Sequence, residues 1–443
     1  MQKKFNTLKK NYLKAKKIKS NLVLIFCLLA CGVSMAQYSL SSPYSRYGIG
    51  TTDVPCNQVM SAMGGIGQAF HRNNVVNTFN PASYTAIDTQ SFVFDIGFQM
   101  GWRTISTSQY SSNSFLAELT NISFGFPITR YLKAGLSLSP LSNISYNSSD
   151  TIAEQATMPL YVKTFDGNGE LDKLTFGLAY QPLFSDFLKR FSIGANVSYT
   201  FGNIYRSTTV AFPDTTGFLN DRSEINYNVS AFSFDFGLQY FQPFENGNIL
   251  GFGLTYTLPM NYGTDNTMFY YTFYDYGNQD VVQDTILYRN YDGDIKMPQR
   301  ISGGLSFEKP NKLFLAADIT YTTWSDFEFQ EEGKTDAMKN NLKINFGSEF
   351  VPDLYGNFVE KFTYRLGFNY DNGYIYLKDN RIAKLGLTFG FSMPIKKLGT
   401  NINFNFEYGK MGTHDNGLVR ENYFKMGLSV TAKDRWFAKR KYK

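Results

Sequence analysis

The chain has 443 residues, of which 43 are Lys or Arg and 37 are Asp or Glu, giving a formal net charge of +6. Eight lysines and no acidic residue precede residue 37, so the remainder carries 35 basic against 37 acidic side chains, which argues against nucleic-acid binding. A hydrophobic fraction of 43% excludes a disordered chain, and the lack of any apolar run near the roughly 18 residues of a spanning helix beyond residue 36 excludes a helical membrane protein.

The N-terminus has the pattern of an export signal. Residues 1–19 are basic, residues 22–30 are apolar, and small residues at 34–36 offer a cleavage site before Gln37. We therefore predict a signal peptide over residues 1–36 and a mature protein in a Gram-negative cell envelope. A competing interpretation is a lipoprotein cleavage box ending at Cys31, which would make Cys31 a lipidated first residue.

Residues 37–90 do not alternate between polar and apolar side chains. They contain several glycines and short polar clusters, which are too irregular for strands. Because a wide barrel has a lumen that needs filling, we predict that this segment is an N-terminal plug, or hatch. A disordered arm and a small periplasmic module are the alternatives.

A period of two dominates the chain from residue 91 to residue 432. In residues 92–103, 191–202 and 232–240, large and often aromatic side chains alternate with Gly, Ser, Thr, Asn and charged residues. Each such run is about 10 residues long, the length of a tilted strand that crosses a bilayer. The pattern predicts an all-β fold, a transmembrane antiparallel β-barrel with apolar side chains outward. A soluble antiparallel sandwich is the alternative, because it also alternates.

Prolines mark the ends of the predicted strands on one side of the membrane. Proline cannot donate to a strand ladder, so it is typical of strand ends. Six such marks are Pro127, Pro182, Pro243, Pro310, Pro352 and Pro394. Between them lie seven polar connections, near residues 104–114, 147–168, 207–223, 263–295, 328–339, 371–380 and 412–419. Three of them are long, and an extra hairpin above the membrane is an alternative for the fourth. Six turns on one side and seven on the other predict about 14 strands.

Two groups of strand residues are candidates for functional positions. Charged side chains on the polar face are predicted to bind the plug or water in the lumen, and they are Asp95, Arg103, Asp235, Asp318, Arg365 and Glu407. Pro140 interrupts the third strand, at residues 132–144, where it removes a ladder hydrogen bond. We predict a lateral gap in the barrel beside Pro140. A proline just above the membrane rim is the alternative.

No catalytic or metal site is predicted. The mature chain has only His71 and His414, and neither lies on a predicted strand where a base of a catalytic triad would be needed. We expect no enzyme activity, no cofactor and no metal. Residues 433–443 form a basic tail, which is predicted to be a solvated periplasmic extension with periplasmic proteins as its only candidate partners.

Several short motifs resemble the FadL-type long-chain fatty-acid transporters of the outer membrane. The segment Ser61 to Gly67 and the triplet Asn80, Pro81 and Ala82 resemble the hatch of that family, whose signature lies shortly before the first barrel strand. The strand end at residues 323–327 is similar to the Trp-Ser strand end of the family, and residues 42–48 and 435–437 are similar to Bacteroidetes-type relatives.

The resemblance implies a function as well as a fold. FadL-type proteins carry hydrophobic molecules from an outer groove, formed by the third and fourth external loops, to a lumen site and then sideways into the membrane. In this chain the fourth connection is aromatic-rich, and the groove candidates are Phe269, Tyr270, Tyr271, Phe273 and Tyr274. A self-packed aromatic loop is the alternative.

We therefore expect a monomeric outer-membrane transporter that takes up fatty-acid-like hydrophobic small molecules by passive diffusion, with outer-membrane lipid around it. The alternative is a FadL-like binding or shuttle component for exported proteins in type IX secretion, with secretion proteins as partners.

Overall fold

The computed structural model describes most of the chain beyond residue 41. The described residues are 42–52, 57–154, 159–213, 217–277, 279–329, 333–334, 337–395 and 399–435. The predicted signal peptide, Cys31 and residues 436–443 of the predicted tail lie outside them. Within the described ranges, no helix combines the length and the hydropathy that crossing a membrane requires.

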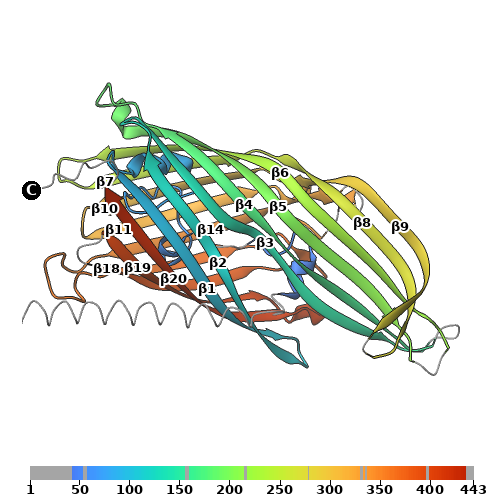
Figure 1. Cartoon of the computed structure of the whole chain (residues 1–443). Coiled ribbons are helices and arrows are strands. Elements are labelled where there is room, and N and C mark those ends of the chain that lie inside the picture. The colour runs from blue at the N-terminus through green and yellow to red at the C-terminus, as the bar shows by residue number, and fades with distance from the viewer. Residues whose placement is uncertain are drawn as a thin grey trace, which may run out of the picture.

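The strands form one closed antiparallel barrel (Figure 1). The first half contains β1 (Ser91–Ser106), β2 (Ser111–Pro127), β3 (Leu132–Ile152), β4 (Tyr161–Tyr180), β5 (Phe191–Ala211), β6 (Asn220–Pro243), β7 (Ile249–Thr257), β8 (Met260–Asp275), β9 (Asp280–Met297) and β10 (Arg300–Lys309). The second half contains β11 (Leu313–Thr322), β14 (Asn341–Phe350), β15 (Thr363–Asp371), β18 (Lys384–Ile395), β19 (Thr400–Gly412) and β20 (Arg420–Arg435). β20 pairs with β1 and closes the sheet.

The predicted fourteen-stranded barrel is confirmed. β7 and β8 both pair with β6, so they form one barrel strand with an interruption at residues 258–259. β9 and β10 likewise form one strand, interrupted at residues 298–299, because they pair with β8 and β7. Each of the six prolines lies at a strand end or in the turn that follows. β20 continues to Arg435, so the first three residues of the predicted tail belong to the barrel.

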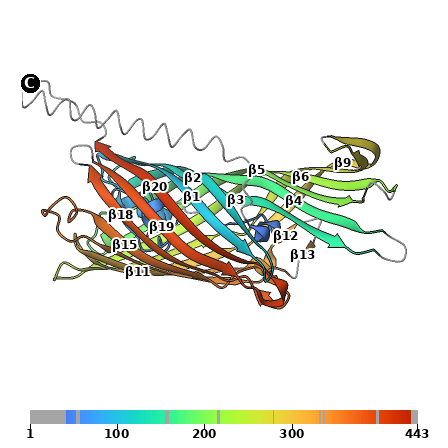
Figure 2. The same ribbon diagram turned by 90° about the horizontal axis from the view of Figure 1, so that it is seen from below.

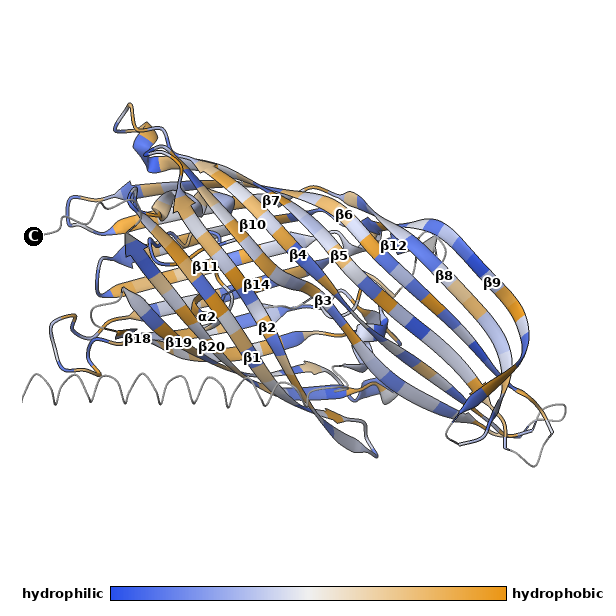
Figure 3. Ribbon diagram, in the orientation of Figure 1, coloured by the Kyte–Doolittle hydropathy of each residue, from blue (hydrophilic) through white to orange (hydrophobic). Residues whose placement is uncertain are grey.

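Alternation sets which side chains meet lipid. Along β5, Ser192, Asn196 and Ser198 are buried while Ile193 and Val197 are exposed on the outer surface. Figure 3 shows the resulting bands of apolar and polar residues along the strands. Because successive strand side chains point to opposite faces, the apolar positions form the lipid-facing belt and the polar ones line the lumen.

Three of the seven predicted polar connections consist mostly of strand, and the extra hairpin considered for residues 263–295 is present as β8 and β9. Residues 147–168, 207–223 and 263–295 lie mostly in strands, and only short segments, such as 153–160 between β3 and β4, connect them. Their polar composition reflects water on both faces of strands that extend past the membrane, where backbone pairing with a neighbour continues. The hairpins β3–β4, β5–β6 and β8–β9 therefore project beyond the rest of the barrel (Figures 1 and 2).

Shorter elements lie inside the barrel or at its outer mouth. The 3-10 helix η1 (Pro43–Arg46), the one-turn α2 (Gln58–Ser61) and the 3-10 helix η2 (Pro81–Ala86) belong to residues 42–90, called the N-terminal segment below. The outer connections contain η5 (Trp324–Asp326), β12 (Glu328–Phe329), β13 (Gly333–Lys334), β16 (Tyr376–Leu377), β17 (Asn380–Arg381) and η6 (Asp415–Gly417). η3 (Leu188–Arg190) lies in the opposite set of turns.

Candidate functional site: the barrel lumen

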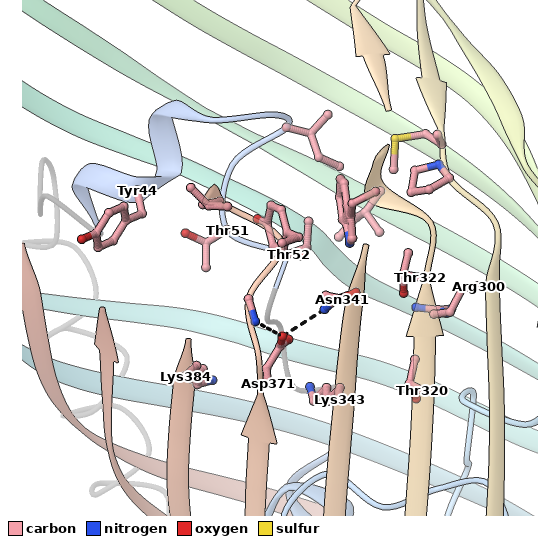
Figure 4. A pocket seen from close by; sticks show the side chains of 18 of the residues that line it. Tyr44, Thr51, Thr52, Arg300, Thr320, Thr322, Asn341, Lys343, Asp371 and Lys384 are labelled. Carbon is pink, nitrogen blue, oxygen red and sulfur yellow. Dashed lines mark hydrogen bonds between the residues drawn. The ribbon is translucent and has the colours of Figure 1, made fainter. Parts of the chain in front are cut away.

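The lumen contains a cavity of about 250 Å³ between the N-terminal segment and the outer mouth. Residues 44–52 supply part of its lining, and the other lining residues come from strands around the barrel, such as Thr320, Asn341 and Asp371 (Figure 4). Asn341 Nδ2 donates to Asp371 Oδ1 at 3.0 Å, which ties β14 to β15 at the rim of the cavity. The cavity therefore lies where distant parts of the sequence meet.

One wall of the cavity is apolar and aromatic. The connection after β11 folds inward, and Trp324 stacks on Tyr374 with ring centroids 4.3 Å apart. Trp324 belongs to a buried cluster that also includes Ile49, Tyr262 and Phe327, and Tyr374 packs against this cluster. Residues 323–327, which the sequence singled out as a strand end, thus form part of an apolar cap under the outer mouth.

Basic side chains from six strands around the barrel also line the cavity. Six of them line the cavity, against one lining carboxylate, Asp371: they are Arg103, Lys173, Arg300, Lys343, Lys384 and Lys425. Arg103 pairs with Glu421 at 2.9 Å and Lys173 pairs with Asp235 at 3.2 Å. These two ion pairs fix the positions of Arg103 and Lys173 at the edge of the cavity. The cavity lining therefore combines apolar and aromatic side chains with basic ones.

The N-terminal segment is fastened to the lumen wall by buried hydrogen bonds. Asn57 Nδ2 donates to Asp95 Oδ2 at 2.9 Å. The backbone N–H groups of Gly67 and Gln68 donate to Asp318 Oδ2 at 2.6 and 3.0 Å. Since buried polar groups need partners, these carboxylates are complementary to donors that the N-terminal segment brings.

Glycines on the lumen face make room for the N-terminal segment. Eleven strands each present one glycine whose added Cβ would collide with, or approach within contact of, residues 58–87: Gly125, Gly135, Gly177, Gly194, Gly237, Gly253, Gly304, Gly347, Gly367, Gly390 and Gly427. At Gly253, a Cβ would lie 1.9 Å from the carbonyl oxygen of Gln68. We call these residues the glycine ring. Sequence reasoning noted a glycine-rich inner face but missed that eleven strands each supply one glycine next to the N-terminal segment.

The barrel wall is incomplete between β2 and β3. Their pairing runs from Pro127–Lys133 to Ile122–Leu138 and ends there. Beyond that level β3 pairs with β4, with a bulge between Pro140 and Ser142. Among the described residues, its other edge meets the N-terminal segment, where the backbones of Thr51 and Asn143 exchange hydrogen bonds of 2.9 and 3.1 Å.

A small cavity of about 50 Å³ lies at this interruption. Its lining includes Leu116 and Glu118 of β2 and Asn143 of β3, whose edges do not pair with each other. It shares four lining residues with the main cavity, namely Thr51, Arg103, Tyr423 and Lys425. The lumen cavity and the interrupted wall are therefore neighbours.

The structure distributes the predicted site residues over several places. Of the predicted lumen charges, Arg365 contacts Glu349 at 2.8 Å, and Glu407 accepts a hydrogen bond from Tyr423 at 3.0 Å. As described above, Arg103 pairs with Glu421 and Asp235 pairs with Lys173, whereas Asp95 and Asp318 bind the N-terminal segment. Asn80, Pro81 and Ala82 are buried at the start of η2. Sequence reasoning did not single out the basic residues that line the cavity, although Lys173, Lys384 and Lys425 occupy polar-face positions of alternating strands.

The candidate groove residues lie on a strand and not in a loop. Phe269 to Tyr274 lie on β8, where neighbouring side chains point to opposite faces. Tyr271 is buried and its hydroxyl donates to Glu224 Oε1 at 2.9 Å, while Phe273 packs under the Arg222 guanidinium, 4.7 Å from the ring centroid. These two rings pack against their own sheet. Within the described ranges, no group of three His, Cys, Asp or Glu side chains is arranged to bind a metal ion.

Solved structures support the same fold. The chain is similar to the Pseudomonas putida toluene transporter TodX, with 15% identity and a TM-score of 0.56 over 87% of this chain and 99% of the other. The CymD monoaromatic hydrocarbon channel is 15% identical, with a TM-score of 0.56 over 88% of this chain and 100% of the other. A Pseudomonas aeruginosa FadL homologue is 13% identical, with a TM-score of 0.54 over 86% of this chain and 98% of the other. The resemblance to FadL-type barrels is thus confirmed for the fold.

Sequence comparisons identify the family. No curated protein sequence matches the chain. The family model described as BamG matches residues 16–443, which is nearly the whole chain. The protein is therefore a member of the BamG family, and its barrel has the FadL-type fold.

Proposed function

We propose that this chain is an outer-membrane transporter that admits hydrophobic small molecules through its lumen and releases them sideways into the membrane. The observation that carries the proposal is the contact between the main cavity and the interrupted wall, which share Arg103 and Tyr423 among their lining residues. The solved neighbours are named as toluene and hydrocarbon channels, and this chain shares their fold at low identity.

A sideways exit suits an apolar substrate. Each methylene that passes into water costs about 0.8 kcal/mol, so an acyl chain of about a dozen carbons would lose on the order of 10 kcal/mol in an aqueous pore. Movement from an apolar cavity into lipid avoids that loss. Beside Pro140, β2 and β3 are not paired, and such pairing would otherwise block sideways movement of a substrate between these strands.

The N-terminal segment is the proposed plug. It fills the lumen at the level of the glycine ring and is bonded to Asp95 and Asp318, so it would block ions and small solutes. The cavity above it is lined by an apolar cap and by six basic side chains. This combination favours molecules with an apolar body and an anionic end, such as fatty acids, over purely apolar hydrocarbons.

Uptake by cells tests the proposal. Cells that lack the chain are complemented with the wild type, with Met260→Trp, which fills the cavity, or with Met100→Trp, which faces outward on β1. Uptake of radiolabelled dodecanoate and toluene is then measured. We expect Met260→Trp to lower dodecanoate uptake by at least about tenfold, equivalent to ~1.4 kcal/mol, and Met100→Trp to leave it unchanged. Equal uptake of both probes with and without the chain would refute transport.

A further inference from the structure

The projecting part of the barrel ends in a strand with a free outer edge. β9 pairs with β8 along its length, from Met260–Met297 to Asp275–Asp280. On its other side, only Ile295 and Lys296 pair, with β12. In the part of the chain that the structure describes, no strand pairs with that side of residues 280–290. Figure 1 shows β9 at the border of the projecting sheet.

This free edge lies beyond the bilayer. The outward side chains of β10 include Ile301 and Leu305, which are 46% and 58% exposed on the lipid-facing belt. On β9 the outward positions become Asp292, Asp294 and Lys296, all exposed. A strand crosses the hydrocarbon in about 9–11 residues, and β10 supplies that length by itself. Residues 280–294 are therefore in water on the outer side.

The edge is unusually apolar for a strand in water. Residues 280–290 are exposed without interruption, and five of them are large apolar residues: Val281, Val282, Ile286, Leu287 and Tyr288. Proteins protect such edges with lysine, proline or bulges, because unpaired backbone groups invite another strand. Residues 280–294 contain no lysine or proline, and their protection consists of two bulges toward β8.

The opposite border of the same projecting sheet provides an internal comparison. There the outer part of β3 carries Asn147, Ser148, Ser149 and Asp150, which are all exposed and polar. Both borders project into the same solvent. The apolar character of β9 is therefore a property of that edge, and not a general consequence of projection.

The charge on the edge restricts the occupant. Residues 280–294 contain four aspartates, Asp280, Asp284, Asp292 and Asp294, against one basic residue, Arg289. Arg222 compensates Asp280 across the sheet at 2.7 Å. A second copy of this edge would bring like charges together, whereas a strand with lysine or arginine would meet opposite charge. The edge is thus complementary to a segment that is both apolar and basic.

We propose that the outer edge of β9 binds an extended, apolar and basic segment of another surface-exposed protein by strand addition. Backbone N–H and C=O groups of residues 280–290 would supply affinity, and the exposed apolar side chains with Asp284, Asp292 and Asp294 would supply selectivity. The inference is independent of the proposed transport, since β9 residues 280–294 do not line the lumen cavity.

Peptide binding to the full chain in detergent tests the inference. The probes are fluorescent peptides that alternate valine with lysine or valine with glutamate. The variants are the double substitution Val282→Lys with Leu287→Lys, and Ser149→Lys on the β3 border as the matched control. We expect the lysine peptide to bind the wild type and the control equally, to bind the double variant at least about tenfold more weakly, and to bind better than the glutamate peptide.

Amide exchange on the wild type locates the bound peptide without any substitution. We expect slower exchange in residues 280–294 when the lysine peptide is bound. Protection confined to other residues, equal affinity of the double variant, or equal affinity of the two peptides would overturn the inference. Dimers in light scattering that disappear in the double variant would also overturn it, because they would identify a second copy as the occupant.

Discussion

The side-chain amide of Asn80 donates a 3.1 Å hydrogen bond to the backbone carbonyl of Leu238 on β6. The same amide donates to the carbonyl of Gln68 at 2.9 Å, and Asn80 Oδ1 accepts from the N–H of Ala82 at 3.1 Å, which caps η2. One fully buried side chain thus ties the N-terminal segment to itself and to the barrel wall.

Replacement of Asn80 tests whether this connection holds the N-terminal segment in place. Asn80→Ala removes the cap, worth about 1 kcal/mol, and two donors worth on the order of 1 kcal/mol each. Asn80→Asp retains the cap acceptor but turns a charge toward two carbonyls. We expect both variants to exchange the amides of residues 68–86 faster and to raise ion conductance in planar bilayers.

Barrel assembly should not change in either Asn80 variant, because the strand pairing of β6 does not involve Asn80. Heat-modifiable mobility on gels provides this control. Wild-type exchange rates and conductance in Asn80→Ala would show that the connection is dispensable.

The glycine ring should tolerate no side chain at its tightest position. In Gly253→Ala the new Cβ would lie 1.9 Å from the Gln68 carbonyl oxygen, so the N-terminal segment or the strand must move. Gly303→Ala is the matched control, since its Cβ would face outward with no atom closer than 3.9 Å. We expect destabilisation of about 1–3 kcal/mol for Gly253→Ala, as for other overpacked sites, and a much smaller change for Gly303→Ala. Urea-induced release of the N-terminal segment, followed by proteolysis, measures the difference; equal midpoints would contradict it.

Pro140 should maintain the interruption between β2 and β3. Pro140→Val restores a backbone N–H and a residue that favours strands, so pairing would extend past Leu138. We expect slower amide exchange at residues 141–142 and lower uptake of hydrophobic probes. Leu136→Val, in the paired part of β3, serves as the control and should change neither quantity. Normal uptake together with slowed exchange would separate the interruption from the exit route.

Acidic pH should weaken the docking of the N-terminal segment through His71. Burial, with the positive charge of Arg72 as a smaller cause, lowers the pKa of His71 from 6.5 to about 4. The docked state favours the neutral ring, so its stability is complete above pH 6.5 and declines as the pH falls toward 4. At pH 5 the loss would be about 2 kcal/mol.

Amide exchange of residues 68–87 at pH 7.5 and pH 5, corrected for intrinsic rates, measures this loss. His71→Phe is the control variant, because a phenyl ring can keep the contact with Phe241, whose centroid lies 4.8 Å from the imidazole. That variant should show no such pH dependence. Equal pH dependence in both proteins would exclude His71 as the cause.

Short-range periodicity was enough to predict the barrel. In residues 92–103 the alternation of aromatic and polar side chains assigns a face to each position, because the period of a strand is two. The six prolines fixed one set of turns, since proline ends backbone pairing wherever it stands. The polar run 147–168 was predicted as a connection although most of it is strand, because composition does not distinguish a loop from a strand with water on both faces.

Only the tertiary structure decided which residues contact one another inside the lumen. Gly251 and Gly253 lie on the same face of β7, yet a Cβ at Gly251 would meet Ser306 and Phe241, whereas one at Gly253 would meet Gln68 of the N-terminal segment. Trp324 and Tyr374 come from different connections and meet only when the barrel closes. The sequence determined which face each residue occupies, a local property of the strand. Which residues share a level inside the barrel depends on register and tilt, which arise from pairing between strands far apart in the chain.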